Sequence, residues 1–217
     1  MPDLVELSEL ATAGGTMILA IATFSSVRSA SASTRLAERS LMASQRPLLV
    51  PSNVDDPAER IRFGDGVIVD IVGHKGALKI HEGGAYMALS LRNGGAGLAV
   101  IHSWHVFTTA GTFEGPSPHL ERPEHVEQFR RQQRDLYIPS GSTGFWQGAI
   151  RDSGDPDNIA LQERAAAGER VHIDLLYGDQ EGGQRCIARF ALPTDPTDND
   201  ARVEVIRYWA VDGTDPR

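Results

Sequence analysis

The stretch VHIDLLYGDQEGGQRCIARFAL, residues 171–192, decides the fold, because two apolar runs flank one glycine-rich turn. Side chains alternate between the two faces of a strand, so every second residue of each run shares a face. On one face the first run carries Val171, Ile173, Leu175 and Tyr177, and the second carries Cys186, Ala188 and Phe190. The letters GDQEGG between them are typical of a tight turn. We predict an antiparallel hairpin whose apolar face lies in the core.

Short runs of the same kind fill the chain on both sides of this hairpin, separated by glycine, proline and aspartate. They are Leu48–Val50, Arg60–Phe63, Val67–Val72, Ala77–His81, Tyr86–Leu91, Leu98–Phe107, Leu136–Ile138, Gly144–Ile150 and Val203–Val211. Turn signals about every ten residues favour antiparallel sheets over alternating strands and helices. We predict a mainly β, immunoglobulin-like antiparallel β-sandwich over residues 47–212, followed by a tail at 213–217.

Two segments within this domain have helical features. Pro123 is suited to the first turn of a helix that would run to Arg134. Pro156 to Ala167 forms the second candidate, and Gly168 is suited to end it. We therefore expect one or two short helices beside the strands.

The N-terminal part differs from the rest, because LATAGGTMILAIATFSSV, Leu10 to Val27, contains no charged residue. Eighteen helical residues would span roughly the 30 Å hydrocarbon core of a bilayer. We predict a short acidic N-terminus at 1–9, a transmembrane helix at 10–27 and a helical stalk at 28–46 that Pro47 ends. A buried or interfacial helix and a cleaved signal peptide are the alternatives.

Charges on either side of the apolar stretch indicate its orientation. Acidic residues precede it, whereas Arg28, Arg35, Arg39 and Arg46 follow it. Arginines close to a span stay in the cytoplasm, so we expect a single-pass protein of the cell membrane with its C-terminal domain in the cytoplasm. Ala11 and Gly15 have the small-residue spacing that lets two helices pair, which makes a homo-oligomer an option. Such residues are also common in helices that do not pair.

Two short motifs resemble a group of uncharacterised bacterial proteins. RPLLVPS, Arg46 to Ser52, matches an R-P-x-x-V first strand, and LRNGGAGLAVI, Leu91 to Ile101, matches an N-x-G-x-G-x-A turn. Members of this group have one N-terminal span followed by a β-sandwich. The resemblance implies that architecture and implies no activity, cofactor or site residue.

Composition excludes some classes of function. The 217-residue chain has a formal net charge of −8 and a pI near 5.3. Binding to nucleic acid needs a basic surface, so we expect no nucleic-acid partner. A single cysteine, Cys186, excludes an intrachain disulfide, and its place in the alternation predicts a buried residue.

Several clusters invite a metal or catalytic interpretation. His102 and His105 lie three apart in a strand, where they would point to opposite faces, and His119 or His125 would have to complete a site. Asp152, Asp155 and Asp157, and separately Asp195, Asp198 and Asp200, have calcium-loop spacing without the EF-hand pattern. Solvated turns are the simpler interpretation. We therefore predict no catalytic, cofactor-binding or metal site and no cofactor.

Arg130, Arg131 and Arg134 form the densest basic cluster of the chain. They are either a solvated helix face or a docking site for anionic headgroups or an acidic partner. The sequence as a whole favours a membrane-anchored β-sandwich that binds or scaffolds a protein partner and is not an enzyme. The alternative is a membrane-anchored metal-dependent hydrolase that uses His102 or His105 with a loop histidine or aspartate.

Overall fold

The computed structural model describes residues 4–107, 121–123, 125–194 and 202–212, without the side chains of 4–12 and 39. The chain divides into two compact units, Met1–Ser44 and Gln45–Arg217. Predictions for His119, for the aspartates at 195–200 and for the tail at 213–217 lie outside the described residues.

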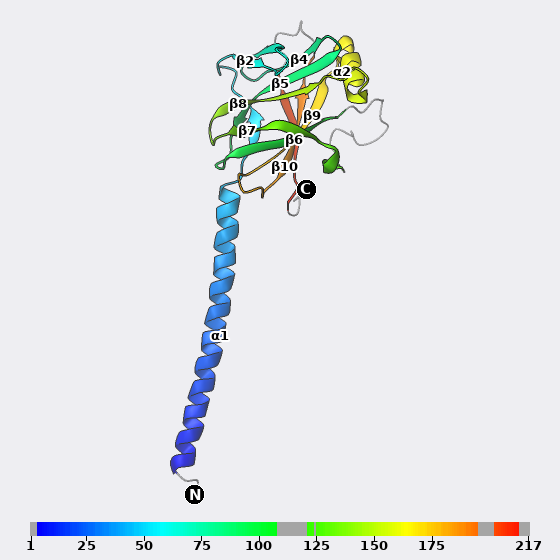
Figure 1. Cartoon of the computed structure of the whole chain (residues 1–217). Coiled ribbons are helices and arrows are strands. Elements are labelled where there is room, and N and C mark those ends of the chain that lie inside the picture. Colours follow the sequence, from blue (N-terminus) through cyan, green and yellow to red (C-terminus); the bar gives the residue numbers. More distant parts are fainter. Residues whose placement is uncertain (1–3, 108–120, 124, 195–201, 213–217) are drawn as a thin grey trace. The chain divides into compact units, whose positions relative to one another are not determined.

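The first unit is one helix, α1 (Leu4–Ser44), of 41 residues. It runs without a break (Figure 1), and it ends before Pro47, as the restriction on the residue before a proline predicts. Hydroxyl side chains bond back to carbonyls one turn earlier, such as Thr23 to Leu19 O at 2.8 Å. The apolar side chains of Met17, Ile21 and Phe24 are 60–70% exposed.

The predicted transmembrane helix is not supported by the structure. Where the side chains of α1 are described, from Ala13 onward, the helix contains no stretch long and apolar enough to cross a membrane. Gly14, Gly15 and Thr16 contribute little apolar surface, and Arg28 places a charge directly after Val27. The side chain of Ala11, part of the expected pairing motif, lies outside the described residues.

The second unit contains one four-stranded antiparallel sheet built around β5 (Gly84–Asn93). One edge of β5 pairs along most of its length with β8 (Thr143–Ile150). Its other edge pairs first with β4 (Gly76–His81) and then with β1 (Leu49–Pro51). As a result, β8 has one strand neighbour in this sheet.

A five-stranded antiparallel sheet has the order β11-β10-β9-β6-β7. Its strands are β6 (Ala99–Phe107), β7 (Arg130–Ile138), β9 (Val171–Gly178), β10 (Cys186–Leu192) and β11 (Glu204–Ala210). The predicted hairpin is confirmed as β9 and β10, with Tyr177 opposite Cys186 and Val171 opposite Leu192. It lies at the centre of the sheet, as Figure 1 shows.

One large core cluster joins the two sheets. It combines Met87, Leu89 and Trp146 of the first sheet with Ile173 and Phe190 of the second, all less than 1% exposed. The mainly β, antiparallel architecture that the short alternating strands predict is therefore confirmed. Cys186 is 4% exposed and belongs to this core, also as expected.

A separate hairpin covers the outer face of the first sheet. It consists of β2 (Glu59–Arg62) and β3 (Ile68–Ile71), joined by a turn that contains Gly64, Asp65 and Gly66. Its apolar residues pack with Tyr86 and Ala88, which lie on the face of β5 opposite to Met87. Both faces of β5 are therefore buried.

The predicted helix at Pro156–Ala167 is confirmed as α2, with the same bounds. Asp155 caps its N-terminus by accepting a hydrogen bond from the Asp157 amide at 3.0 Å, and Pro156 occupies the first turn. Gly168 ends the helix in the left-handed conformation, at φ 68°.

The predicted helix from Pro123 to Arg134 is wrong. This segment contains a short 3₁₀ turn, η2 (Val126–Gln128), and then enters β7 at Arg130. Arginine and glutamine favour a helix on their own, but pairing of β7 with β6 decides the conformation here. The arginines therefore lie on a strand, and the interpretation as a helix face no longer applies.

Candidate functional site: an arginine-lined hollow between two sheet edges

Two consecutive strands, β7 and β8, leave the turn at residues 139–142 and enter different sheets. Among the described residues, each of them is an edge strand, because β7 pairs only with β6 and β8 only with β5. The two strands diverge from the turn without forming a ladder with each other. Space therefore opens between the edges of the two sheets.

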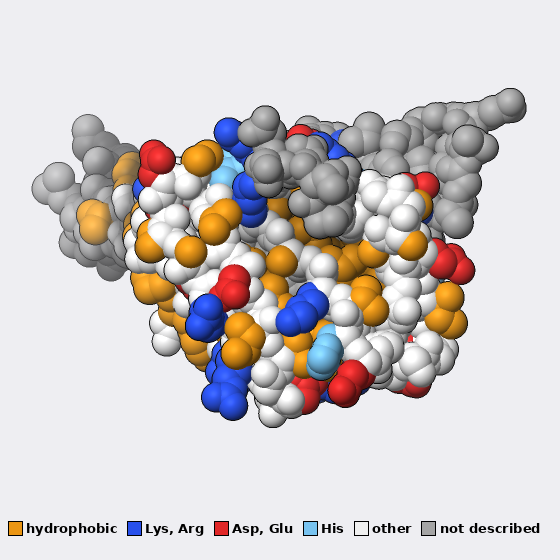
Figure 2. All heavy atoms as spheres, turned by 90° about the horizontal axis from the view of Figure 1, so that it is seen from above, with side chains coloured by type: hydrophobic (Ala, Val, Ile, Leu, Met, Phe, Trp, Pro, Cys, Tyr) orange, Lys and Arg blue, Asp and Glu red, His pale blue; other side chains and the backbone are white. Residues whose placement is uncertain are grey.

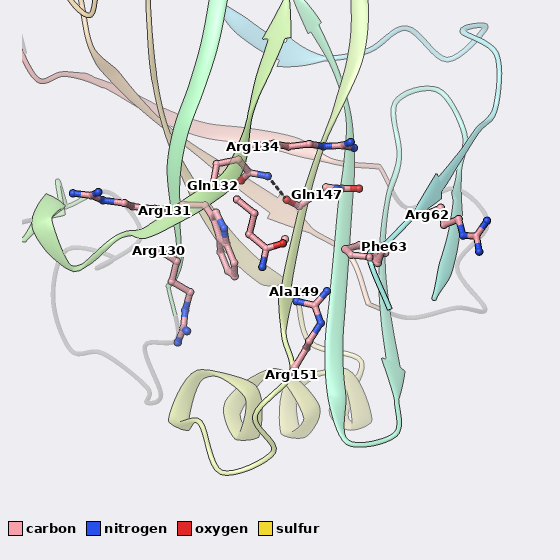
Figure 3. Close-up of a pocket in the computed structure, with 13 residues that line it drawn as sticks. Arg62, Phe63, Arg130, Arg131, Gln132, Arg134, Gln147, Ala149 and Arg151 are labelled. Carbon is pink, nitrogen blue, oxygen red and sulfur yellow. Dashed lines mark hydrogen bonds between the residues drawn. The ribbon is translucent and has the colours of Figure 1, made fainter. Parts of the chain in front are cut away.

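A hollow of about 470 Å³ occupies this space, and the β2–β3 hairpin closes one side of it. We call it the β7–β8 hollow (Figure 3). Its lining includes five arginines, contributed by the hairpin, by β7 and by the end of β8: Arg62, Arg130, Arg131, Arg134 and Arg151. No described aspartate or glutamate belongs to the lining.

An irregularity in β7 presents several of these side chains. Ile101 pairs with Leu136 and Ser103 with Arg131, so one residue of β6 is opposite four residues of β7, 132–135. A bulge bends its strand and changes the direction of the side chains it carries. Gln132, Gln133 and Arg134 come from this bulge and line the hollow.

Two of the arginines have carboxylate partners within the fold. Arg130 contacts Asp155 at 2.9 Å and Asp157 at 2.8 Å, at the N-terminus of α2. Arg151 donates to Asp65 at 2.6 Å. Burial alone would raise the pKa of Asp65, but hydrogen bonds from Arg151 and Tyr86 outweigh it and hold that pKa below its ordinary value.

The other three arginines, Arg62, Arg131 and Arg134, are exposed and make no hydrogen bond or ion pair with any described residue. Figure 3 shows Arg134 extending from β7 across the hollow and Arg151 ending beside Ala149, whereas Arg131 points away from them. Five arginines against three paired carboxylates leave an excess of two positive charges around the hollow.

Trp104 lines the hollow as an apolar floor, and Trp146, which is fully buried and not part of the lining, packs against it. Trp104 and Trp146 contact each other edge to face, with ring centroids 5.4 Å apart. Both lie close to Gly148, where a Cβ would come within 2.6 Å of Trp146 Cζ2 and 3.0 Å of Trp104 Cε2. Glycine at this position is therefore required for the two rings to pack together.

Amide groups complete the lining. Gln132 accepts a hydrogen bond from the Trp146 indole at 3.2 Å and donates one to Gln147 O at 2.9 Å, so its side chain bridges β7 and β8. The Gln147 side-chain oxygen is buried without a hydrogen-bond partner among the described residues. A buried acceptor without a donor is unfavourable, which leaves Gln147 able to accept from a ligand.

This arrangement is suited to binding an anion. Guanidinium groups bind carboxylates and phosphates through paired N–H donors, and the glutamines add neutral donors and acceptors. The described lining contains no histidine, cysteine, serine or carboxylate that would act as a nucleophile or a general base.

The histidines do not join this site. β6 bulges at His102, since Ile101 pairs with Tyr177 and Ser103 with Leu176. The bulge brings His102 to the same face of the sheet as His105, so the predicted opposite orientation is wrong. Within the described ranges, no three histidine, cysteine, aspartate or glutamate side chains form a group that would hold a metal. His125 is exposed and contacts Glu127 at 3.3 Å.

Asp155 and Asp157 are not the solvated turn residues that the sequence suggests. They are half-buried, they pair with Arg130, and Asp155 caps α2. Asp152 accepts a hydrogen bond from the Gly154 amide at 2.9 Å in the preceding turn.

Sequence reasoning finds part of this hollow. The run of basic residues marks Arg130, Arg131 and Arg134, but it places them on a helix. Arg62 and Arg151 are far from that run in the chain, and each is a single arginine at the end of a strand with no local pattern. The glutamine bridge also leaves no signal, because it depends on how two sheet edges meet.

On the face shown in Figure 2, basic and acidic side chains alternate with apolar ones and form no large field of one charge. Comparisons with protein families, with characterised proteins and with solved structures found no match to this chain.

Proposed function

We propose that this protein is a binding module that holds an acidic segment of a partner protein in the β7–β8 hollow, while α1 attaches the module to a membrane. The observation that carries the proposal is the hollow itself, whose described lining contains five arginines and no acid. Arg134 extends across the hollow and has no partner among the described residues, which leaves it available to a carboxylate.

The shape of the hollow favours a protein segment over a lipid headgroup. Sheet edges, a glutamine bridge and a tryptophan floor surround the arginines, so a ligand contacts apolar and amide groups as well as charge. A headgroup at a membrane surface would use the charges alone. The negative net charge of −8 also disfavours general attraction to anionic surfaces.

Membrane attachment is the second part of the proposal, together with the immunoglobulin-like arrangement of the sheets. The stretch from Leu10 to Val27 contains no charge, and its described apolar side chains, such as Ile18 and Leu19, are 70% exposed. Exposed apolar surface of this extent favours a lipid environment. Arg28 and Arg35 after the stretch favour a cytoplasmic position for the β unit.

A charge reversal tests the binding proposal. The ligand is a short blocked peptide in which glutamate alternates with valine, titrated into the full-length chain in neutral detergent and followed by calorimetry. Arg134→Glu should weaken binding about tenfold, because one attractive contact becomes repulsive. Arg202→Glu is the matched control, since Arg202 is exposed, outside the hollow and without a described partner.

Equal weakening by both substitutions would show a general charge effect, and the proposal would fail. A lysine and valine peptide of the same length should not bind the unmodified chain. If the unmodified chain binds vesicles of anionic lipid but no acidic peptide, the hollow recognises headgroups and the proposed partner is wrong.

Membrane attachment is tested separately, with vesicles of neutral lipid. The full-length chain should float with them in a density gradient, whereas a variant carrying Ile18→Ser, Ile21→Ser and Phe24→Ser should stay at the bottom. An active alkaline phosphatase fused after Arg217 would contradict the cytoplasmic orientation, and a fluorescent fusion that matures would agree with it.

A further inference from the structure

The hollow contains more than charge, because the outer edge of β8 lies within it. Gln147, Gly148 and Ala149 all line the hollow, and no strand of the described chain pairs with this edge. An unpaired edge presents main-chain N–H and C=O groups that can template another strand. The hydrogen bonds of β5 determine which groups those are.

In an antiparallel ladder, the main-chain groups of successive residues point alternately to the two neighbouring strands. The Ser90 amide donates to Lys75 O at 3.0 Å, and Ser90 O accepts from the Ser52 amide at 3.1 Å. The main-chain N–H and C=O groups of Ser90 therefore point away from β8, and those of its neighbours Leu89 and Leu91 point toward β8. These two residues are opposite Trp146 and Gly144.

It follows that the main-chain groups of even-numbered residues of β8 bond to β5, and those of odd-numbered residues point away from β5. Phe145, Gln147 and Ala149 direct their N–H and C=O groups to the free edge. One of these groups has a described partner, Gln147 O, which accepts from the Gln132 side chain at 2.9 Å. That bond agrees with the assignment, and it shows that a donor from the β7 side reaches this edge.

We propose that the acidic segment binds as an added strand along the outer edge of β8, with its main chain paired to Phe145, Gln147 and Ala149 and its carboxylates contacting the arginines of the hollow. This inference rests on the proposed function and specifies how the partner binds. Main-chain pairing of this kind supplies affinity, and pockets for alternate side chains supply specificity.

Charge and amide chemistry both agree with an extended acidic strand. Side chains of a strand alternate between two faces, so one face can present carboxylates to Arg134 and Arg151 while the other packs toward the apolar side of the hollow. The Gln147 side-chain oxygen, buried without a described donor, lies beside the same edge and can accept an N–H from the added strand.

The edge also explains the Gln132 bridge. In the free protein, Gln132 occupies one of the acceptors that would otherwise invite pairing with another chain, as native edge strands commonly require. An added strand replaces this side-chain bond with a main-chain bond.

Backbone methylation separates strand pairing from charge recognition. Three blocked peptides share the alternating glutamate and valine sequence: one unmodified, one N-methylated at every glutamate and one N-methylated at every valine. Only one set of amides faces β8, so one methylated peptide should bind the full-length chain at least tenfold more weakly than the unmodified peptide. The second methylated peptide, whose methyl groups lie on the amides that face away from β8, should bind more tightly than the first.

Equal affinity of all three peptides would overturn the strand inference, while the acidic-partner proposal would stand. Loss of binding by Arg134→Glu in that case would confirm that charge alone is recognised. If the unmodified peptide does not bind at all, the proposed function fails first, and the two failures are thereby distinguished. Thermal unfolding of each protein variant shows whether it is folded.

Discussion

Gly148 allows the two tryptophans to meet beneath the hollow. A Cβ at this position would lie 2.6 Å from Trp146 Cζ2 and 3.0 Å from Trp104 Cε2, both atoms of buried rings that cannot shift freely. We expect Gly148→Ala to lower the free energy of unfolding by about 1–3 kcal/mol, as overpacking of a core does. Denaturant unfolding followed by tryptophan fluorescence measures it.

Gly64→Ala is the matched control for this substitution. Gly64 also lines the hollow, but no atom lies within 4 Å of a Cβ placed on it. Its effect should stay within about 0.5 kcal/mol. An equal loss of stability for both variants would mean that the tryptophan floor is not packed as described.

Asp174 and Arg189 form a buried ion pair on the face of the five-stranded sheet away from the main core. Arg189 donates to Asp174 at 2.6 and 2.7 Å, and both side chains are 0% exposed. Burial raises the pKa of Asp174 despite this partner. Asp174→Asn removes one charge and should cost about 3–5 kcal/mol of unfolding free energy in a denaturant titration.

The exposed pair of Arg60 and Asp70 provides the comparison. Its atoms are 2.8 Å apart, a similar distance, but both side chains are more than 60% exposed. Water screens such a pair, so Asp70→Asn should change the unfolding free energy by less than about 1 kcal/mol. A cost for Asp174→Asn no larger than this would contradict the burial of the ion pair.

At the scale of elements, the β9–β10 hairpin gives a direct test of register. Cys186 pairs with Tyr177 in the ladder and is 4% exposed. A shift by one residue would turn Cys186 to the other face. Since it is the single cysteine of the chain, thiol labelling should be slow in the native protein and rapid after denaturation. Rapid labelling of the native protein would contradict this register.

Tyr208 ties β11 to β1, because its hydroxyl donates to Leu49 O. Burial, with a smaller contribution from Cys186, raises the pKa of Tyr208 from 10.0 to about 12. A raised folded-state pKa favours the neutral form, so this contribution to stability is complete below pH 10 and is lost as pH rises toward 12.

The free energy of unfolding should decline between pH 10 and pH 12, and Tyr208→Phe should make this decline smaller. Tyr177, whose pKa is also raised by burial, contributes a further decline in both proteins. An unfolding free energy that stays constant from pH 10 to pH 12 would contradict the buried, hydrogen-bonded state of Tyr208.

Elements differ in how far the sequence predicts them. The alternation of Val171 to Tyr177 and the caps of α2 act locally, so strand, register and helix bounds follow from nearby residues. The conformation of β7 does not follow from nearby residues, because RRQQR favours a helix and pairing with β6 overrides that preference. The basic cluster therefore identifies residues that line the hollow, but the sequence places them on a helix instead of a strand.

On the scale of the whole molecule, the hollow brings together residues that are distant in sequence. Arg62, Arg134 and Arg151 come from a hairpin, a bulged edge strand and a strand end, and no spacing rule connects them. Likewise, the free edge of β8 exists because β7 leaves for the other sheet. Tertiary arrangement therefore decides the site, whereas patterns along the chain largely decide the strands.

Amide hydrogen exchange at β8 tests the central claim most directly, because alternate residues of one strand serve as probe and control. When the unmodified acidic peptide binds the full-length chain, exchange should slow at the outward amides of Phe145, Gln147 and Ala149. The amides of Gly144, Trp146 and Gly148 already face β5, so their exchange should change much less. Slowed exchange elsewhere in the chain, with the outward amides of β8 unaffected, would contradict pairing of the peptide with this edge.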